Sequence, residues 1–241
     1  MTYCVGLLLN EGMVLLSDTR TNSGLDHISS YRKMFYFDVP GERAIVIQTA
    51  GSLSTTQSVL ARLQEAIDDP EATEDTSILL APTMLKVAEI IGATLWAVRS
   101  AVDQRLKTNG QFGQASMIIA GQRTGGVMRM FLIYPEGNFI EATEDTPFLQ
   151  IGEHKYGKPI LDRMVRPDTS LEDGKKAVLL SMDSTLRSNL SVGMPLDLAI
   201  IRDGECRIGV QRRIEAGDAD FAKMSAAWSK ALRDSFVRMK I

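Results

Sequence analysis

The order of the predicted strands and helices is the feature that most limits how this chain can fold. Runs with alternating apolar residues, typical of strands, lie at both ends and in the middle, and paired stretches with apolar residues every three or four positions, typical of helices, separate them. This order is typical of an α+β protein with layered antiparallel sheets and helices outside, not of βαβ units. Because no internal repeat, low-complexity segment or linker interrupts the sequence, we expect a single domain over residues 1–241.

The periodicity also sets approximate bounds. The expected strands cover residues 2–9, 13–17, 33–39, 43–49, 115–120, 127–134, 147–151, 197–202 and 206–211. The expected helices cover residues 52–68, 77–107, 155–165, 170–189 and 218–239. Gly12 and Gly204 are expected in the turns of two hairpins. An apolar stripe on the last helix, which includes Phe236 and Met239, is expected in the core or in a subunit contact.

Composition and charge narrow the classes of function. The chain is 44% hydrophobic and 24% charged, as in ordinary globular proteins. Its net charge of −3 provides no basic field, so we expect neither nucleic acid nor a membrane surface as a partner. The apolar run 3–9 is too short to span a bilayer and follows no basic residue, which predicts a cytoplasmic protein without a signal peptide. Cys4 and Cys206 are expected to be buried in strands as small apolar side chains.

The familiar cofactor and metal motifs are incomplete in this sequence. The segment GEHKYGKP approaches a phosphate-binding loop, but Pro159 stands where that motif needs the hydroxyl of Ser or Thr. The two histidines, His27 and His154, have no metal-ligand partner at a useful spacing. We therefore expect no metal and no organic cofactor.

The first residues, MTYCVGLLLNEG, offer a different chemistry. Methionine is commonly removed before a small residue, and we expect this removal to leave Thr2 as the N-terminus. An α-amino group has a pKa of about 7.7–8.0, so it can accept a proton near neutral pH, and a threonine hydroxyl paired with its own amine is a recognised activated nucleophile. A strand that begins at once would hold this amine rigidly, and we expect no leader ahead of it.

Here the sequence resembles the proteasome β subunits. The resemblance rests on TYCVGLLLNEGMVLLSDTRTNSG, on the lysine of YRKMFYF, on IQTAGSLSTTQSVL and on FGQASMIIAG followed by YPEGNF, and it spans nearly the whole chain in order. The segment QIGEHKYGKPILDR and the absence of a propeptide are most similar to the bacterial "ancestral β subunit" group, Anbu. The peptidase ring of the bacterial heat-shock protease is the next most similar. The resemblance implies a four-layer αββα sandwich of two antiparallel sheets flanked by helices.

The resemblance also implies roles for individual residues. Thr2 would be the nucleophile and its amine the base. Lys33 would lie near the threonine oxygen and keep local pKa values low, and Asp18 would pair with Lys33. The backbone N–H of Gly51 would bind the oxyanion. Three residues would line the pocket for the substrate side chain: Thr21, Thr49 and Leu53.

The positions that support the amine in the family are only partly retained. Ser191 matches the family, whereas Ser188 replaces its aspartate and Glu153 its serine, and these departures predict a weak or specialised activity. The predicted function is a threonine-type peptidase acting on peptides or proteins. It would assemble into a homo-oligomeric ring or stack, and any unfolding ATPase would be a separate chain. Two alternatives stay open at this point: a non-catalytic ring scaffold, and an amidase acting on a non-peptide amide.

Overall fold

The period-two runs form two five-stranded antiparallel sheets in a computed structural model that describes residues 1–22, 28–106 and 113–240. The strand order of the first sheet is β10 (Phe148–Gly152), β1 (Tyr3–Leu9), β2 (Gly12–Asp18), β11 (Leu196–Arg202) and β12 (Val210–Ile214). The second has the order β5 (Met34–Val39), β6 (Arg43–Gly51), β7 (Ala115–Arg123), β8 (Arg129–Ile133) and β9 (Phe139–Glu141). A separate short pair consists of β3 (Arg20–Asn22) and β4 (Ile28–Ser30).

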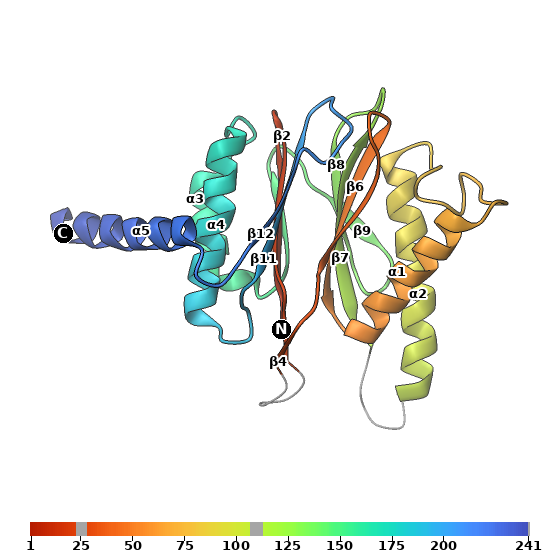
Figure 1. Cartoon of the computed structure of the whole chain (residues 1–241), viewed down its shortest axis with the longest axis horizontal. Coiled ribbons are helices and arrows are strands. Elements are labelled where there is room, and N and C mark those ends of the chain that lie inside the picture. Colours follow the sequence, from red (N-terminus) through yellow and green to blue (C-terminus); the bar gives the residue numbers. More distant parts are fainter. Residues whose placement is uncertain (23–27, 107–112, 241) are drawn as a thin grey trace.

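Helices cover the outer face of each sheet (Figure 1). The second sheet is covered by α1 (Leu53–Asp68) and α2 (Met84–Leu106). The first is covered by α3 (Lys158–Met164) and α4 (Leu171–Ser188), preceded by a short 3-10 helix, η2 (His154–Tyr156). The C-terminal helix α5 (Ala219–Arg238) extends away from α4 and out of the body. No helix in the described residues is long and apolar enough to cross a membrane.

Three apolar clusters join these four layers. One packs α1 and α2 against the second sheet around Ile47 and Phe131, and another packs α4 against the first sheet around Leu7 and Met182. The third lies between the sheets and includes Leu15. The predicted α+β sandwich of two antiparallel sheets flanked by helices is therefore confirmed.

Two of the predicted helices have different bounds in the structure. The helix expected over 77–107 begins at Met84, because Pro82 disfavours a helical conformation just before it and Thr83 accepts a hydrogen bond from Lys86 N at 3.1 Å, as a helix cap does. Its expected last residue, Lys107, lies outside the described residues. The helix expected over 155–165 is divided into η2 and α3, and Pro159 lies in the first turn of α3.

The last hairpin differs from the prediction too. Cys206 is buried, but it lies in a loop with φ of 45° and not in a strand, and β12 begins only at Val210. The first four residues of β12 are exposed, so its polar sequence VQRRI carries no apolar alternation. The strands β3, β4 and β9 are three residues each and were not predicted, because a period cannot be recognised over so short a run.

Candidate active site

Thr2 lies at the end of the first sheet, directly before β1 and 8% exposed. Its carbonyl oxygen accepts a hydrogen bond from Glu153 N at 2.7 Å. Gly152 has φ of 82°, and a Cβ at this position would collide with that carbonyl oxygen. Two neighbouring strands therefore hold the backbone of Thr2, as expected for an N-terminus that must be rigid.

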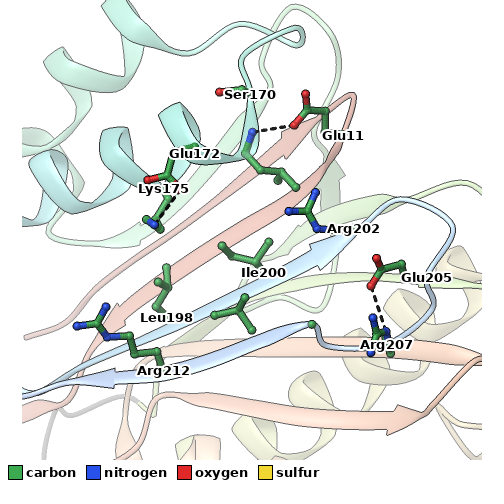
Figure 2. Close-up of a pocket in the computed structure, with 13 residues that line it drawn as sticks. Glu11, Ser170, Glu172, Lys175, Leu198, Ile200, Arg202, Glu205, Arg207 and Arg212 are labelled. Carbon is green, nitrogen blue, oxygen red and sulfur yellow. Dashed lines mark hydrogen bonds and ion pairs between the residues drawn. The ribbon is translucent and has the colours of Figure 1, made fainter.

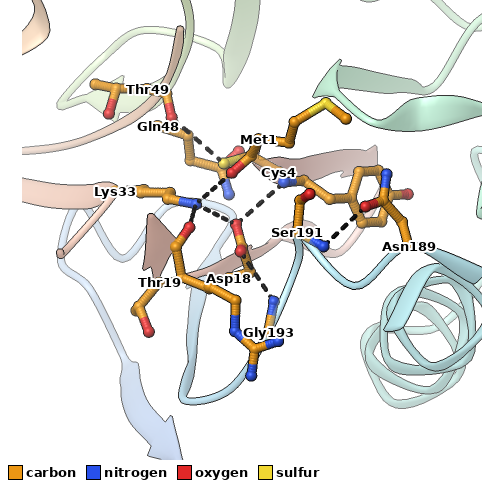
Figure 3. Close-up of polar contacts among 12 residues, drawn as sticks. Met1, Cys4, Asp18, Thr19, Lys33, Gln48, Thr49, Asn189, Ser191 and Gly193 are labelled. Atoms are coloured by element: carbon orange, nitrogen blue, oxygen red, sulfur yellow. Dashed lines mark hydrogen bonds and ion pairs between the residues drawn. The ribbon is translucent and has the colours of Figure 1, made fainter. Parts of the chain in front are cut away.

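A buried ion pair lies beside this N-terminus. Lys33 precedes β5 in the second sheet, Asp18 ends β2 in the first, and Lys33 Nζ lies 2.8 Å from Asp18 Oδ1 (Figure 3). Both side chains are almost completely buried. The ammonium also donates to the carbonyl oxygens of Arg20 and, at 3.2 Å, of Met1. A positive charge therefore faces the peptide bond that joins Met1 to Thr2.

Asp18 is held by backbone groups as well as by the lysine. Tyr3 N donates to Asp18 Oδ1 at 3.1 Å and Gly193 N donates to Oδ2 at 3.2 Å. Burial raises the pKa of the Asp18 carboxyl above its ordinary value, while Lys33 and the two N–H groups oppose this rise. Three segments of the chain therefore converge on the carboxylate that ends β2: the start of β1, the residue before β5 and the loop before β11.

Tyr3 fixes the other side of the strand that carries Thr2. Its hydroxyl is 2.6 Å from Ser181 Oγ on α4 and accepts a hydrogen bond from Gln150 Nε2 at 2.6 Å. Burial raises the pKa of this hydroxyl to about 12, so it stays protonated at neutral pH. Tyr3 thus connects Asp18 to α4: its N–H contacts the Asp18 carboxylate, and its hydroxyl contacts Ser181. The contacts of Tyr3 N and Gly193 N with Asp18 were not predicted, because backbone donors leave no side-chain signal in a sequence.

A cavity of about 390 Å³ opens beside Thr2 and Lys33. The three predicted pocket residues, Thr21, Thr49 and Leu53, all line it. Its remaining lining residues are Met1, Ala50, Gly51 and Thr56. The cavity therefore brings together the predicted nucleophile, lysine, oxyanion donor and pocket residues.

The direction of the Gly51 N–H follows from the register of β6. Thr49 N donates to Lys33 O at 2.9 Å, toward the β5 side of the strand. Alternate N–H groups of a strand face the same edge, so the Gly51 N–H faces this edge too, beyond Met34, the first residue of β5, and at the cavity. This direction is the one that an oxyanion donor next to Lys33 needs.

The sequence model of the family described as "Proteasome subunit" matches residues 2–201. The chain belongs to the proteasome subunit family. A structure of an Anbu Gly-1 mutant from Hyphomicrobium sp. strain MC1 is 45% identical with a TM-score of 0.93, covering 100% of this chain and 99% of that chain.

Two further Anbu structures are similar to this chain over nearly its whole length. That from Yersinia bercovieri is 42% identical with a TM-score of 0.92, covering 99% of this chain and 97% of that chain. That from Pseudomonas aeruginosa, described as a helical assembly of the Anbu complex, is 43% identical with the same TM-score and the same coverage. Among curated proteins nothing matches. The resemblance to the Anbu group of the proteasome family is thus confirmed.

The three positions that the resemblance linked to the amine lie on two segments of the chain, one that begins with the last residue of α4 and one directly after β10. Ser191 lies in the loop after α4 and, with Lys33, flanks Asp18 in Figure 3. Its backbone N–H donates to Asn189 Oδ1 at 2.9 Å. Ser188, which replaces the family's aspartate, is the last residue of α4, and Glu153 lies next to Thr2 on the β10 side. The loop that carries Ser191 continues to Gly193 and so to Asp18.

The cavity of about 450 Å³ in Figure 2 is a different place. It lies at the opposite end of the first sheet from Thr2, between the start of α4 and the strands β11 and β12. Glu11 Oε2 accepts a hydrogen bond from Leu171 N at 3.1 Å, and ion pairs join Lys175 to Glu172 and Arg207 to Glu205. Because several of its charges are engaged in stabilising contacts, we assign it no chemistry.

The structure bears on the predicted absence of a metal site only for the residues that it describes. Among the described residues, no group of three or more His, Cys, Asp and Glu side chains could hold a metal ion. His154 Nδ1 is 3.2 Å from Gly152 O, whereas His27 lies outside the described residues. The absence of a cofactor stays a prediction.

Proposed function

We propose that the chain is an N-terminal threonine hydrolase that cleaves peptide bonds through an acyl-enzyme on Thr2, once Met1 has been removed. The observation that carries the proposal is the buried Lys33–Asp18 pair, whose ammonium lies against the carbonyl of Met1. That ammonium would lie beside the amine and hydroxyl of a processed Thr2.

The reaction follows from the groups in the cavity. The neutral α-amine of Thr2 accepts the proton of Oγ as Oγ attacks the substrate carbonyl, and the Gly51 N–H stabilises the negative oxygen. The amine then gives the proton to the leaving nitrogen as the C–N bond breaks, which leaves an ester on Oγ. Water, deprotonated by the same amine, hydrolyses this ester and restores Thr2. Lys33 lowers the cost of the developing negative charge.

The surroundings of the N-terminus suit this role of an amine as a base. Burial, and then the charge of Lys33, lower the pKa of the N-terminal amine below its ordinary value, while Asp18 and Glu153 act in the opposite direction. That amine belongs to Met1, and the amine of a processed Thr2 would lie one residue deeper in the same surroundings. A lowered pKa increases the neutral, proton-accepting fraction at neutral pH.

Labelling of the intact protein tests the proposal. Intact-mass analysis should show the loss of one methionine, and a β-lactone should then add one acyl group, which peptide mapping should locate on Thr2. Thr21 and Thr49 line the same cavity and serve as internal controls that should stay unlabelled. Retention of Met1, or labelling spread over several threonines, would instead favour the scaffold alternative.

Self-assembly is the second part of the proposal, and α5 is the surface that supports it. Leu232 is 51%, Phe236 78% and Val237 81% exposed on a helix that extends away from the body (Figure 1). The Pseudomonas aeruginosa Anbu structure is described as a helical assembly. We infer that a second copy of this chain covers the apolar end of α5.

A charge on α5 is expected to weaken this assembly. Phe236→Glu places a carboxylate in the apolar contact, so light scattering should detect a shift to smaller species at equal protein concentration. Lys223→Glu, on the same helix and 80% exposed, is the matched control and should leave the mass distribution unchanged. An unchanged distribution for the Phe236 variant, or a wild-type monomer of 26.5 kDa, would contradict the inference.

A further inference from the structure

The loop between α4 and β11 supplies one of the hydrogen bonds that hold Asp18. Gly193 N, in the second half of this loop, donates to Asp18 Oδ2 at 3.2 Å (Figure 3). Among the described residues, Oδ2 has no other hydrogen-bond partner, whereas Oδ1 binds both Lys33 Nζ and Tyr3 N. Asp18 is fully buried, so the loss of this bond would leave a charged oxygen unpaired inside the protein. The position of the loop therefore decides whether both oxygens of the carboxylate are paired.

The residue directly after β2 holds this loop in place. Thr19 is 1% exposed, and its Oγ1 donates to Pro195 O, at the end of the loop, at 2.7 Å. Thr19 N also donates to Gly193 O at 3.4 Å. The start of the loop is held separately, by a solvent-exposed hydrogen bond from Arg20 Nη1 to Leu190 O at 2.9 Å. Thr19 thus contacts the loop at the residue that pairs with the carboxylate and again two residues later.

The Thr19 hydroxyl sets how closely the end of the loop approaches β2. A hydroxyl oxygen lies 2.7 Å from Pro195 O, whereas a methyl carbon in its place would stay at about 3.3 Å or more. The bond from Gly193 N to Asp18 is already at the long end of the range for N–H···O hydrogen bonds. A displacement of the loop by roughly 0.6 Å, the difference between the two contacts, would therefore break it.

We propose that Thr19 is a positioning residue for the active site: its hydroxyl holds the loop so that Gly193 N pairs with Asp18, and Asp18 in turn orients Lys33. This role rests on the proposed function for its effect on catalysis, because Lys33 acts there on the charge that develops at Thr2. The contacts that cause it exist whether or not the protein reacts with a substrate. The cause and the effect are therefore measured by separate experiments.

Thr19→Val and Thr19→Ser distinguish the hydroxyl from the shape of the side chain. The first keeps the branched shape without the hydroxyl, so acylation of Thr2 by a β-lactone should be about tenfold slower than in the wild type. The second keeps the hydroxyl and should restore a rate close to that of the wild type. Thr94→Val, the control, removes a similar bond, from Thr94 Oγ1 to Ile90 O at 2.8 Å in α2, and should leave the rate unchanged. A wild-type rate for Thr19→Val, or equal losses in both Thr19 variants, would overturn the proposed role.

Urea unfolding measured against pH tests the hydrogen bond to Asp18 without requiring catalysis. When the Gly193 N–H no longer pairs with the carboxylate, the pKa of Asp18 in the folded protein rises, because a bond to the ionised form is lost. Thr19→Val should therefore lose more stability as pH rises through the ionisation of Asp18. The ratio of its unfolding constant to that of the wild type should grow about tenfold from acid to neutral pH. Loss of the bond to Pro195 alone would give a ratio that does not vary with pH.

The other titratable groups around Asp18 are the same in the variant and in the wild type. They are Lys33, the N-terminal amine and the Cys4 thiol, and burial raises the pKa of that thiol, so it stays neutral throughout the series. The control Thr94→Val should give a constant ratio. A constant ratio for Thr19→Val would overturn the inference. A ratio that grows in a protein whose Thr2 takes no β-lactone would support the hold of Thr19 on Asp18 while overturning the proposed hydrolase.

Discussion

Lys33→Ala is expected to reduce acylation of Thr2 by a β-lactone at least about 100-fold and to destabilise the fold. The substitution removes the charge beside the nucleophile and leaves the buried Asp18 carboxylate without its ion-pair partner. Breaking a buried pair in this way costs about 3–5 kcal/mol of the free energy of unfolding. Labelling rates and urea unfolding curves measure the two effects separately.

The pH dependence of stability shows whether Asp18 causes this loss. Without Lys33, burial keeps the folded-state pKa of Asp18 above its unfolded value, so the protonated form of the folded protein is favoured. The loss relative to wild type should thus be smallest in acid and should grow as pH rises through the ionisation of Asp18. A loss of equal size at all pH values would contradict this cause.

Two further variants separate chemistry from folding. Lys33→Met combined with Asp18→Asn removes both charges, so it should recover part of the stability and none of the labelling. Lys86→Ala removes a lysine whose partner, Asp75, is exposed at the surface, and it should alter neither quantity. Labelling of Lys33→Ala at the wild-type rate would remove Lys33 from the proposed mechanism.

The sequence indicated side chains better than it indicated the backbone that holds them. The run from Thr2 and the lysine of YRKMFYF are visible in a linear sequence, and the structure brings Thr2, Asp18 and Lys33 together at one end of the sandwich. Their family roles came from a resemblance that fixes their order along the chain. No one of these three residues alone indicates that their side chains lie together in the fold.

The contacts that the sequence did not reveal connect distant segments. Gly193 N reaches Asp18 across 175 positions and the Tyr3 hydroxyl reaches Ser181 across 178. Both depend on how α4 and the following loop return to the first sheet, which no local period describes. The strand β12 was misplaced for a related reason: its residues are exposed at a sheet edge, so the apolar alternation that marks buried strands is absent.

Gly51→Ala is expected to reduce acylation of Thr2 by about 100- to 1000-fold, the usual consequence of losing one oxyanion donor. Gly51 has φ of 102°, and a Cβ would collide with the carbonyl oxygen of Gln114 across the β6–β7 pair. The strand end must therefore move, and the N–H that faces the cavity moves with it. The strained backbone alone adds a cost of order 1–3 kcal/mol to the folded state.

A matched glycine separates strain from chemistry. Gly125 has φ of 72° in the loop between β7 and β8, and a Cβ there would meet nothing within 4 Å. Gly125→Ala should therefore lose stability by the backbone strain alone and should acylate Thr2 at the wild-type rate. Labelling is measured well below the midpoint of thermal unfolding of each variant, so that only folded protein reacts. If Gly51→Ala reacts as fast as Gly125→Ala, another group must bind the oxyanion, because displacement of the Gly51 N–H would then have no effect on the transition state.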